Sequence, residues 1–179
     1  ADQTFTRHYE RCFGPPFYSF DWGGRHFVMQ MDFDRCFSPA DQARKANWLE
    51  ADLGRQPPGR EIIVVLHGPP AADFIQQLSR FEVSTVLYGH RHSSKVCRHH
   101  GIDLICTPAF CFGGTDTAPA SFRLLDFSAS ATRYRLLAVN EDRLSTQTPS
   151  QLDVSSANLE LLWERRLPSD LHRAAPVCR

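Results

Sequence analysis

Two short apolar segments of this 179-residue chain each end close to histidines, and this repeated arrangement constrains the fold more than any other feature. The run Ile-Ile-Val-Val-Leu at residues 62–66 leads into His67, and the run at residues 83–88 leads into Gly89 and then His90 and His92. Short runs rich in β-branched residues are typical of buried strands. Open α/β sheets bind ligands at the carboxyl ends of their strands. We therefore expect the three histidines to meet at one edge of a sheet, which predicts a metal site.

The surrounding sequence alternates between strand and helix patterns. Gly23-Gly24 separates two alternating segments, which predicts a β-hairpin. Ser38 can cap a helix in which apolar residues recur at helical spacing as far as Gly54. This order of elements predicts an α/β fold with a mixed sheet, in a domain over residues 1–140. The expected elements are strands at 17–21, 25–31, 61–66, 83–88, 102–106, 121–127 and 132–139, helices at 39–53 and 72–80, and an irregular segment at 1–14.

Composition argues against two classes of partner. Lysine plus arginine and aspartate plus glutamate each number 20, so the chain lacks the basic footprint of a nucleic-acid-binding protein. The apolar run at 62–66 is far too short to cross a bilayer, and no targeting segment is recognisable, so the compartment stays open.

The six cysteines include no C-x-x-C pair, which fits neither a zinc knuckle nor a disulfide framework.

The character of the sequence changes after residue 140. Residues 141–158 are rich in Ser, Thr, Gln and Asp, which predicts a linker. Residues 159–179 begin a new apolar and aromatic pattern, which predicts the start of a further β segment. Within it, residues 162–168 and 172–177 resemble the opening strands of a PQQ-type β-propeller repeat. A plain C-terminal strand is the alternative.

The histidines after the second apolar run suit a metal for a chemical reason. A neutral imidazole offers one lone pair and is available at neutral pH. In extended backbone, residues two apart point to the same side, so His90 and His92 are expected to face one volume while Arg91 points away. In a chain with eight histidines, the alternative is that the pattern arises by chance. The other histidines are assigned to turns, surface or packing: His8, His26, His99, His100 and His172.

Together these features resemble the C-terminal half of the calcineurin-like metallophosphoesterases. The resemblance runs from about Phe13 to Val139 and so covers most of the chain. Its most specific part is the Gly-His-x-His motif with an upstream His-x-Pro. The segments that carry it are residues 14–21, 48–53, 67–70, 86–92, 107–108 and 113–114. The family fold is an αββα sandwich, so the resemblance implies that this chain forms the mixed-sheet half of such a sandwich.

The resemblance also implies a ligand set. His67 and His90 would bind one metal ion, and His92 would bind a second. In such sites two divalent ions of the Mn, Fe or Zn class clamp a phosphate ester and generate a hydroxide for in-line attack on phosphorus. Arg91 is a candidate contact for the substrate phosphate, and a solvated surface arginine is the alternative.

Only part of the family's ligand set is present. The other ligands come from D-x-H, G-D-x-x-D and G-N-H-D/E motifs, none of which precedes His90 in this chain. Asp32 and Asp34 form a D-x-D in a region where the family has no ligands, and they are interpreted as loop carboxylates. We therefore expect the N-terminal half of the domain, with the catalytic residues, to lie before Ala1. The isolated chain is then expected to be inactive.

Three functions are consistent with the sequence. The first is the C-terminal half of a two-metal phosphoesterase that hydrolyses a phosphate mono- or diester. The second is a non-catalytic α/β scaffold that binds a partner or a single metal. The third is a hydrolase with one metal held by the three histidines alone, since three histidines suffice for a catalytic zinc.

Overall fold

The computed structural model describes residues 3–32, 36–111, 113–127, 133–139, 159–166 and 173–174. The chain divides into two units, and each is described separately. Unit 1 consists of Ala1–Tyr88 and His99–Leu104, and unit 2 consists of Gly89–Arg98 and Ile105–Arg179.

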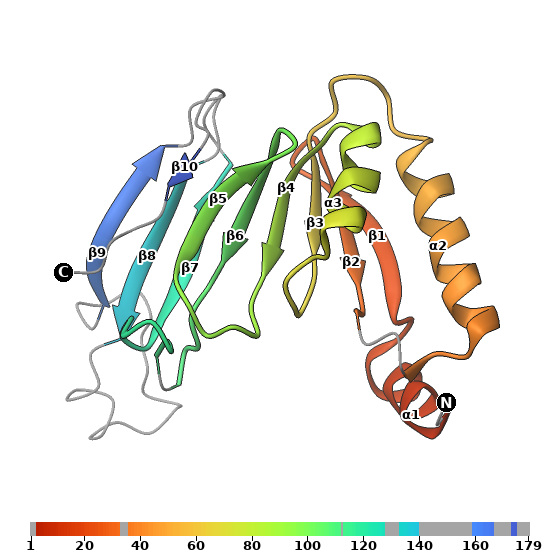
Figure 1. Ribbon diagram of the computed structural model, residues 1–179, viewed down its shortest axis with the longest axis horizontal. Coiled ribbons are helices and arrows are strands. Elements are labelled where there is room, and N and C mark those ends of the chain that lie inside the picture. The colour runs from red at the N-terminus through yellow and green to blue at the C-terminus, as the bar shows by residue number, and fades with distance from the viewer. Residues whose placement is uncertain are drawn as a thin grey trace. The chain divides into compact units, whose positions relative to one another are not determined.

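Unit 1 is built on a mixed sheet with the strand order β1-β2-β3-β4-β6 (Figure 1). β1 and β2 run antiparallel, whereas β2, β3 and β4 run parallel to one another. The strands are β1 (Phe17–Trp22), β2 (Arg25–Gln30), β3 (Ile62–Val65), β4 (Val83–Tyr88) and β6 (Ile102–Cys106), of which residues 102–104 belong to this unit. The predicted α/β fold with a mixed sheet is confirmed.

The hairpin of β1 and β2 follows from its two glycines. Trp22 pairs with Arg25, so the loop contains only Gly23 and Gly24. Their φ angles are +57° and +78°, as required for the two central residues of a type I′ turn. Glycine adopts this backbone without the steric cost that a Cβ atom brings.

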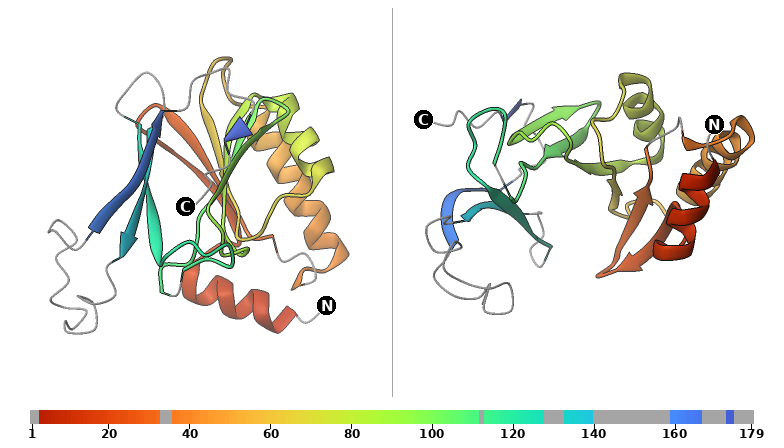
Figure 2. Two further views of the ribbon diagram at one scale, coloured as in Figure 1. Left: turned by 60° about the vertical axis from the view of Figure 1, so that its left-hand side comes forward. Right: turned by 90° about the horizontal axis from the view of Figure 1, so that it is seen from below.

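Two helices connect the parallel strands, and both lie on the same side of them (Figure 2). α2 (Pro39–Leu53) leads from β2 to β3; the Ser38 hydroxyl accepts a hydrogen bond from the Asp41 amide and caps its first turn. α3 (Ala72–Leu78) leads from β3 to β4 and continues as a 3₁₀ turn, Ser79–Phe81. Apolar side chains from strands and helices form the core of this unit, including Val28, Leu49, Leu53, Ile63, Val64, Ile75, Leu78 and Val86.

The N-terminal segment differs from its prediction. Residues 1–14 were expected to be irregular, but Gln3–Phe13 form helix α1. Tyr9 and Phe13 lie one helical turn apart with ring centroids at 5.2 Å, an i, i+4 aromatic pair that stabilises a helix. The many polar residues of this segment masked that spacing.

Unit 2 contains an antiparallel three-stranded sheet, β7-β8-β9. Most of β5 (Lys95–His99) also belongs to unit 2, where it pairs antiparallel with β10 (Arg173–Ala174). This strand was not predicted. The predicted linker at 141–158 lies outside the described residues. Whether residues 159–179 open a further domain stays a prediction. The three strands of the sheet are β7 (Ser121–Asp126), β8 (Arg133–Val139) and β9 (Leu159–Arg166).

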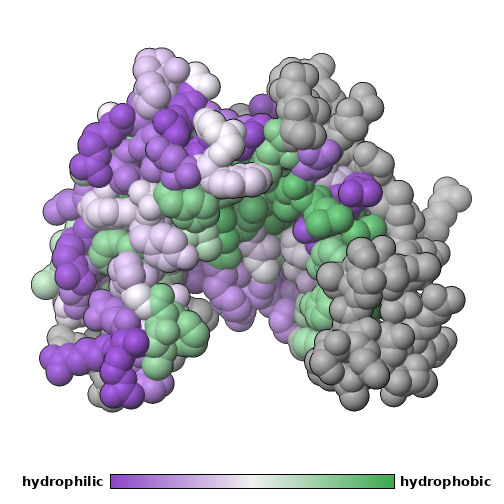
Figure 3. Space-filling model, turned by 180° about the vertical axis from the view of Figure 1, so that it is seen from behind, coloured by the Kyte–Doolittle hydropathy of each residue, from purple (hydrophilic) through white to green (hydrophobic). Residues whose placement is uncertain are grey.

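The sheet of unit 1 carries aromatic side chains on the face away from α2. Alternate residues of β1 point to opposite faces, and its residue Phe17 packs on Trp48 of α2. Tyr18, Phe20 and Trp22 therefore point the other way, and each is at least 40% exposed. Figure 3, viewed from behind, shows hydrophobic residues gathered at the surface. No helix of the described part is long and apolar enough to cross a membrane.

Candidate functional site

His67 lies in a loop that begins directly after β3. Its side chain is exposed, and the next residue, Gly68, is buried. The Gly68 amide donates a 2.5 Å hydrogen bond to Asp32 Oδ2, just beyond the end of β2. A Cβ atom at Gly68 would lie 2.8 Å from the same oxygen, so glycine permits this close approach. Asp32 therefore holds the His67 loop; its predicted companion, Asp34, lies outside the described residues.

His90 and His92 follow β4 in left-handed backbone conformations. Their φ angles are +61° and +45°, whereas residues other than glycine rarely have positive φ. Such backbone costs roughly 1–3 kcal/mol per residue and is concentrated at functional sites. His90 is exposed and His92 is half-buried. The loop is not extended, so the alternation used to place both imidazoles on one side does not apply.

Hydrogen bonds to the segment after Gly113 fix this loop. The Thr115 amide donates to the His92 carbonyl at 2.5 Å, and the Thr115 hydroxyl donates to the Arg91 carbonyl at 3.0 Å. A Cβ atom at Gly114 would lie 2.6 Å from the His92 carbonyl oxygen. The glycine pair therefore lets a second segment approach and hold the backbone of the Gly-His-Arg-His loop. Arg91 is exposed, as either interpretation of it requires.

Arg123 of β7 supports the same loop from the interior of unit 2. Its Nη2 atom donates to Ser94 Oγ at 3.2 Å and to the Cys106 carbonyl at 3.1 Å. Its guanidinium lies 5.1 Å from the centre of the Tyr134 ring. Burial lowers the pKa of Arg123 to about 10. Sequence reasoning missed this residue, although a charge at the inward-facing position of a strand was a signal.

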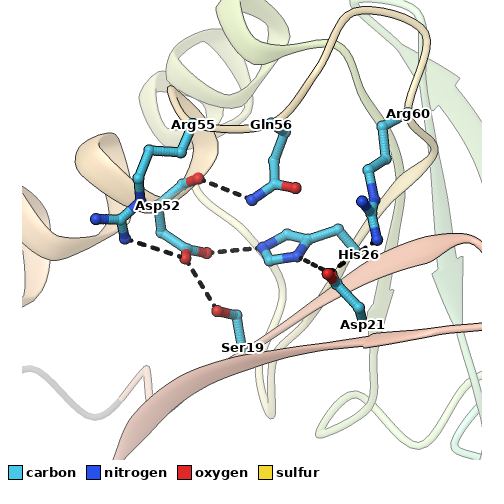
Figure 4. A network of polar contacts seen from close by, with 7 residues as sticks. All are labelled: Ser19, Asp21, His26, Asp52, Arg55, Gln56 and Arg60. Carbon is cyan, nitrogen blue, oxygen red and sulfur yellow. Dashed lines mark hydrogen bonds and ion pairs between the residues drawn. The ribbon is translucent and has the colours of Figure 1, made fainter.

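A buried polar network surrounds His26 of β2 (Figure 4). Its Nδ1 atom lies 2.7 Å from Asp21 Oδ1, and its Nε2 atom lies 2.8 Å from Asp52 Oδ2. Ser19 Oγ donates to Asp52 Oδ1 at 3.0 Å. Each ring nitrogen of His26 therefore faces a carboxylate oxygen. The network ties the β1–β2 hairpin to α2.

This network connects the β1–β2 hairpin to α2 and lies away from the carboxyl ends of the strands, where the metal site was predicted. His26 pairs with Ile62 at the start of β3, which is the amino end of the parallel strands. The loop of His67 leaves the opposite, carboxyl end, where α/β folds bind ligands. His26 was assigned to surface or packing; it is 4% exposed and belongs to the interior.

The Asp21–His26 contact predicts a pH dependence of stability. The hydrogen bond from His26, assisted by the charge of Arg60, holds the pKa of Asp21 below its ordinary value of 3.8. Ionised Asp21 therefore stabilises the fold above that value, and the contribution is lost as pH falls through the lowered pKa. In urea unfolding at stepped pH, wild type is expected to exceed Asp21→Asn in stability at pH 6 and to converge with it at strongly acid pH. A constant difference would contradict this assignment.

The structure brings only some of the predicted site residues into a common unit. His67 belongs to unit 1, and His90, Arg91 and His92 belong to unit 2. Among the described residues, no group of three or more His, Cys, Asp or Glu side chains is placed to hold a metal ion.

Comparison with known proteins gives similarity at the level of fold. No family model matches the chain, and no curated protein sequence matches it. Among solved structures, GAP50, the anchor in the inner membrane complex of Plasmodium, is similar with a TM-score of 0.58 and 14% identity. The match covers 84% of this chain and 52% of that one, so the chain spans about half of its length. The α/β fold is therefore shared with a solved protein.

Two further solved structures are similar to a lesser degree. Vacuolar Protein Sorting 29 from Cryptosporidium parvum has a TM-score of 0.40 and 11% identity, covering 86% of this chain and 58% of that one. A putative 5′-nucleotidase from Staphylococcus aureus has a TM-score of 0.37 and 12% identity, covering 87% of this chain and 29% of that one. With TM-scores this low, neither bears on the function of the chain.

Proposed function

We propose that this chain supplies one half of a two-metal phosphoesterase site, with the remaining ligands coming from outside these 179 residues. His67 and His90 would hold one divalent ion and His92 the second. When bound, the two ions would polarise a phosphate mono- or diester for in-line attack by water.

One observation carries this proposal. β3 and β4 are adjacent and parallel, with Val65 paired to Leu87, so they end at the same edge of the sheet. His67 follows the end of β3 by two residues, and His90 follows the end of β4 by two residues. The carboxyl ends of neighbouring parallel strands are where such folds bind ligands, which supports a site for the histidines that follow them.

The backbone of the second loop supports the same proposal. Two left-handed histidines in one loop store strain, and hydrogen bonds from Thr115 hold the loop in that form. A loop held in this way keeps its ligands in place before metal arrives, which lowers the entropic cost of binding. Arg91, exposed between them, is available to contact a phosphate oxygen.

Metal binding by the 179-residue chain tests the proposal. We expect isothermal titration calorimetry to detect Mn²⁺ or Zn²⁺, with affinity lowered at least about tenfold by His90→Ala or His67→Ala. His100→Ala is the matched control, because His100 is exposed in the turn between β5 and β6, and it is expected to leave the affinity unchanged. The chain alone is expected not to hydrolyse p-nitrophenyl phosphate or its bis ester.

Two outcomes would contradict the half-site. If the chain alone hydrolysed either ester and His90→Ala abolished the activity, these histidines would form a complete centre. If neither ion bound, or if His90→Ala and His100→Ala bound equally well, the metal proposal would fail. The non-catalytic scaffold would then be the better account. The exposed aromatic side chains Tyr18, Phe20 and Trp22 favour that second candidate, because apolar patches commonly mark partner surfaces.

A further inference from the structure

β1 forms one edge of the unit 1 sheet, because it is the first strand in the order β1-β2-β3-β4-β6 (Figure 1). The backbone groups on the outer side of an edge strand can pair with another chain. Natural proteins often protect such edges with lysine, proline or a bulge. β1 has none of these: its six residues pair with β2 in unbroken register, and its one charged residue is Asp21.

The backbone of Phe17, Ser19 and Asp21 points away from β2. In an antiparallel pair, alternate residues exchange hydrogen bonds with the neighbouring strand, and the residues between them face outward. The Pro16 carbonyl accepts from the Met31 amide at 2.9 Å, so the even-numbered residues of β1 are the ones that bond to β2. In the part of the chain that the structure describes, the outward amides and carbonyls bond to no other backbone group. β1 therefore presents a set of donors and acceptors to a further strand.

Aromatic side chains extend to the same edge on the face away from α2. Tyr18 and Phe20 are exposed, and their ring centroids lie 6.4 Å apart. Phe20 also stacks on Phe27 of β2, with centroids 5.1 Å apart. The row of rings stops at the edge of the sheet, where aromatic side chains of an added strand can continue it.

An antiparallel copy of β1 fits this edge in one register. When Ser19 lies opposite Ser19 of the second copy, residue 17 faces residue 21, so all three outward residues of each copy find partners. Tyr18 of each copy then lies opposite Phe20 of the other. This is a non-hydrogen-bonded pair, in which side chains are closest and aromatic contacts are favourable. A shift by two residues in either direction leaves one outward residue of each copy without an outward partner.

The charges at the two ends of β1 agree with this register. Arg44 of α2 lies over the Phe17 ring, 5.7 Å from its centre, and Asp21 is at the other end of the strand. More than half of each of these two charged side chains is exposed. Since residue 17 faces residue 21 of the second copy, each Arg44 approaches the Asp21 carboxylate of the other chain. The surface is therefore complementary to itself in charge, as a two-fold contact requires.

We propose that β1 is a self-association surface, at which two copies of this chain form a symmetric dimer by antiparallel pairing of their β1 strands. Ser19 of both copies lies at the two-fold axis, and the rings of Tyr18 and Phe20 pack across it. Only the six residues of β1 pair on each side, whereas standard interfaces have roughly 20–30 residues a side, so the dimer is weak and reversible. None of the proposed metal ligands takes part, so the dimer is tested without metal.

Sedimentation velocity of the 179-residue chain at two concentrations about fiftyfold apart measures the association. We expect the average mass to rise with concentration in the micromolar range. Arg44→Glu puts like charges at both ends of the strand pair and is expected to raise the dissociation constant about tenfold at low salt, and by less at about 1 M salt. Arg80→Glu, in the 3₁₀ turn after α3, is the matched control: Arg80 is exposed, and no effect is expected.

Tyr18→Lys is a second variant, because an edge lysine opposes strand pairing; it is expected to weaken the dimer at least about tenfold. Amide hydrogen exchange of the wild-type chain tests the register. At the higher concentration, the amides of Phe17, Ser19 and Asp21 are expected to exchange about fivefold more slowly. The even-numbered amides of β1 already bond to β2, so their exchange is expected to change less.

The proposal is overturned if the wild-type chain stays monomeric at the higher concentration, or if Arg44→Glu and Arg80→Glu associate equally well. It is also overturned if a dimer forms without slower exchange at the three outward amides, because the contact would then lie on the aromatic face or in unit 2. Since the exchange experiment uses the wild-type chain, a folding defect in either variant leaves the test decisive.

Discussion

Asp52→Ala is expected to lower the free energy of unfolding by about 1–3 kcal/mol, because it leaves a buried imidazole nitrogen without its hydrogen-bond partner. The Asp52 side chain is 8% exposed and lies 2.8 Å from His26, whose side chain is 5% exposed. The substitution also removes the acceptor of the Ser19 hydroxyl and so weakens the joint between β1 and α2. A loss of this size is a large share of the 5–15 kcal/mol that holds a typical domain together.

Urea unfolding followed by circular dichroism measures this effect. Glu50→Ala is the matched control on the same helix, since Glu50 is exposed and has one 3.2 Å contact with Gln77; we expect it to cost less than about 0.5 kcal/mol. Asp52→Asn keeps an oxygen for Ser19, so its loss of unfolding free energy is expected to lie between those of Asp52→Ala and Glu50→Ala. Equal stabilities for Asp52→Ala and Glu50→Ala would show that the network does not hold the hairpin to α2.

Gly113→Ala is expected to destabilise the chain by about 2–4 kcal/mol, since it combines backbone strain with a backbone clash. Gly113 has a φ of +78°, and an added Cβ would lie 2.4 Å from the Ala118 carbonyl oxygen. Neither that carbonyl nor the turn after it is the movable end of a side chain. The segment that holds the His92 carbonyl would have to shift.

Gly59 provides a control in which only the strain is present. Its φ is +77°, and an added Cβ would meet nothing within 4 Å, so Gly59→Ala is expected to cost only about 1–2 kcal/mol. Denaturant unfolding of both variants isolates the cost of the clash. If the two variants were equally stable, the close approach at Gly113 would not constrain this segment. The segment would then not explain how the loop of His90 and His92 is held.

Local sequence rules were sufficient for the elements whose form is decided by neighbouring residues. The Gly23-Gly24 turn, the Ser38 cap and the apolar strands were predicted because each depends on interactions within a few positions of the chain. Helix α1 and strand β5 were missed. In α1 the aromatic spacing is hidden among polar residues. In β5, which is hydrogen-bonded to the neighbouring strand β6 as well as to β10, the charged and polar residues Lys95, Arg98 and His99 hide the strand pattern.

The candidate site divides in the same way. The positions of His67 and His90 after two strands could be predicted from the sequence, because a strand end is a local feature. The left-handed backbone of His90 and His92 could not, because Thr115, more than 20 positions later, contributes the hydrogen bonds that hold it. Arg123 was missed for the same reason, since its contacts with Ser94 and Cys106 join separate segments.

By itself, the sequence determined the strands and helices of the hairpin and the βαβ units, and the histidines at the ends of β3 and β4. Short-range sterics, capping and apolar spacing are sufficient for these, and they act before the chain has folded. Only the tertiary structure decided that His26 is buried, with its two ring nitrogens facing Asp21 and Asp52. Burial and partnership are properties of segments distant in sequence, and they exist only once the sheet has brought those segments together.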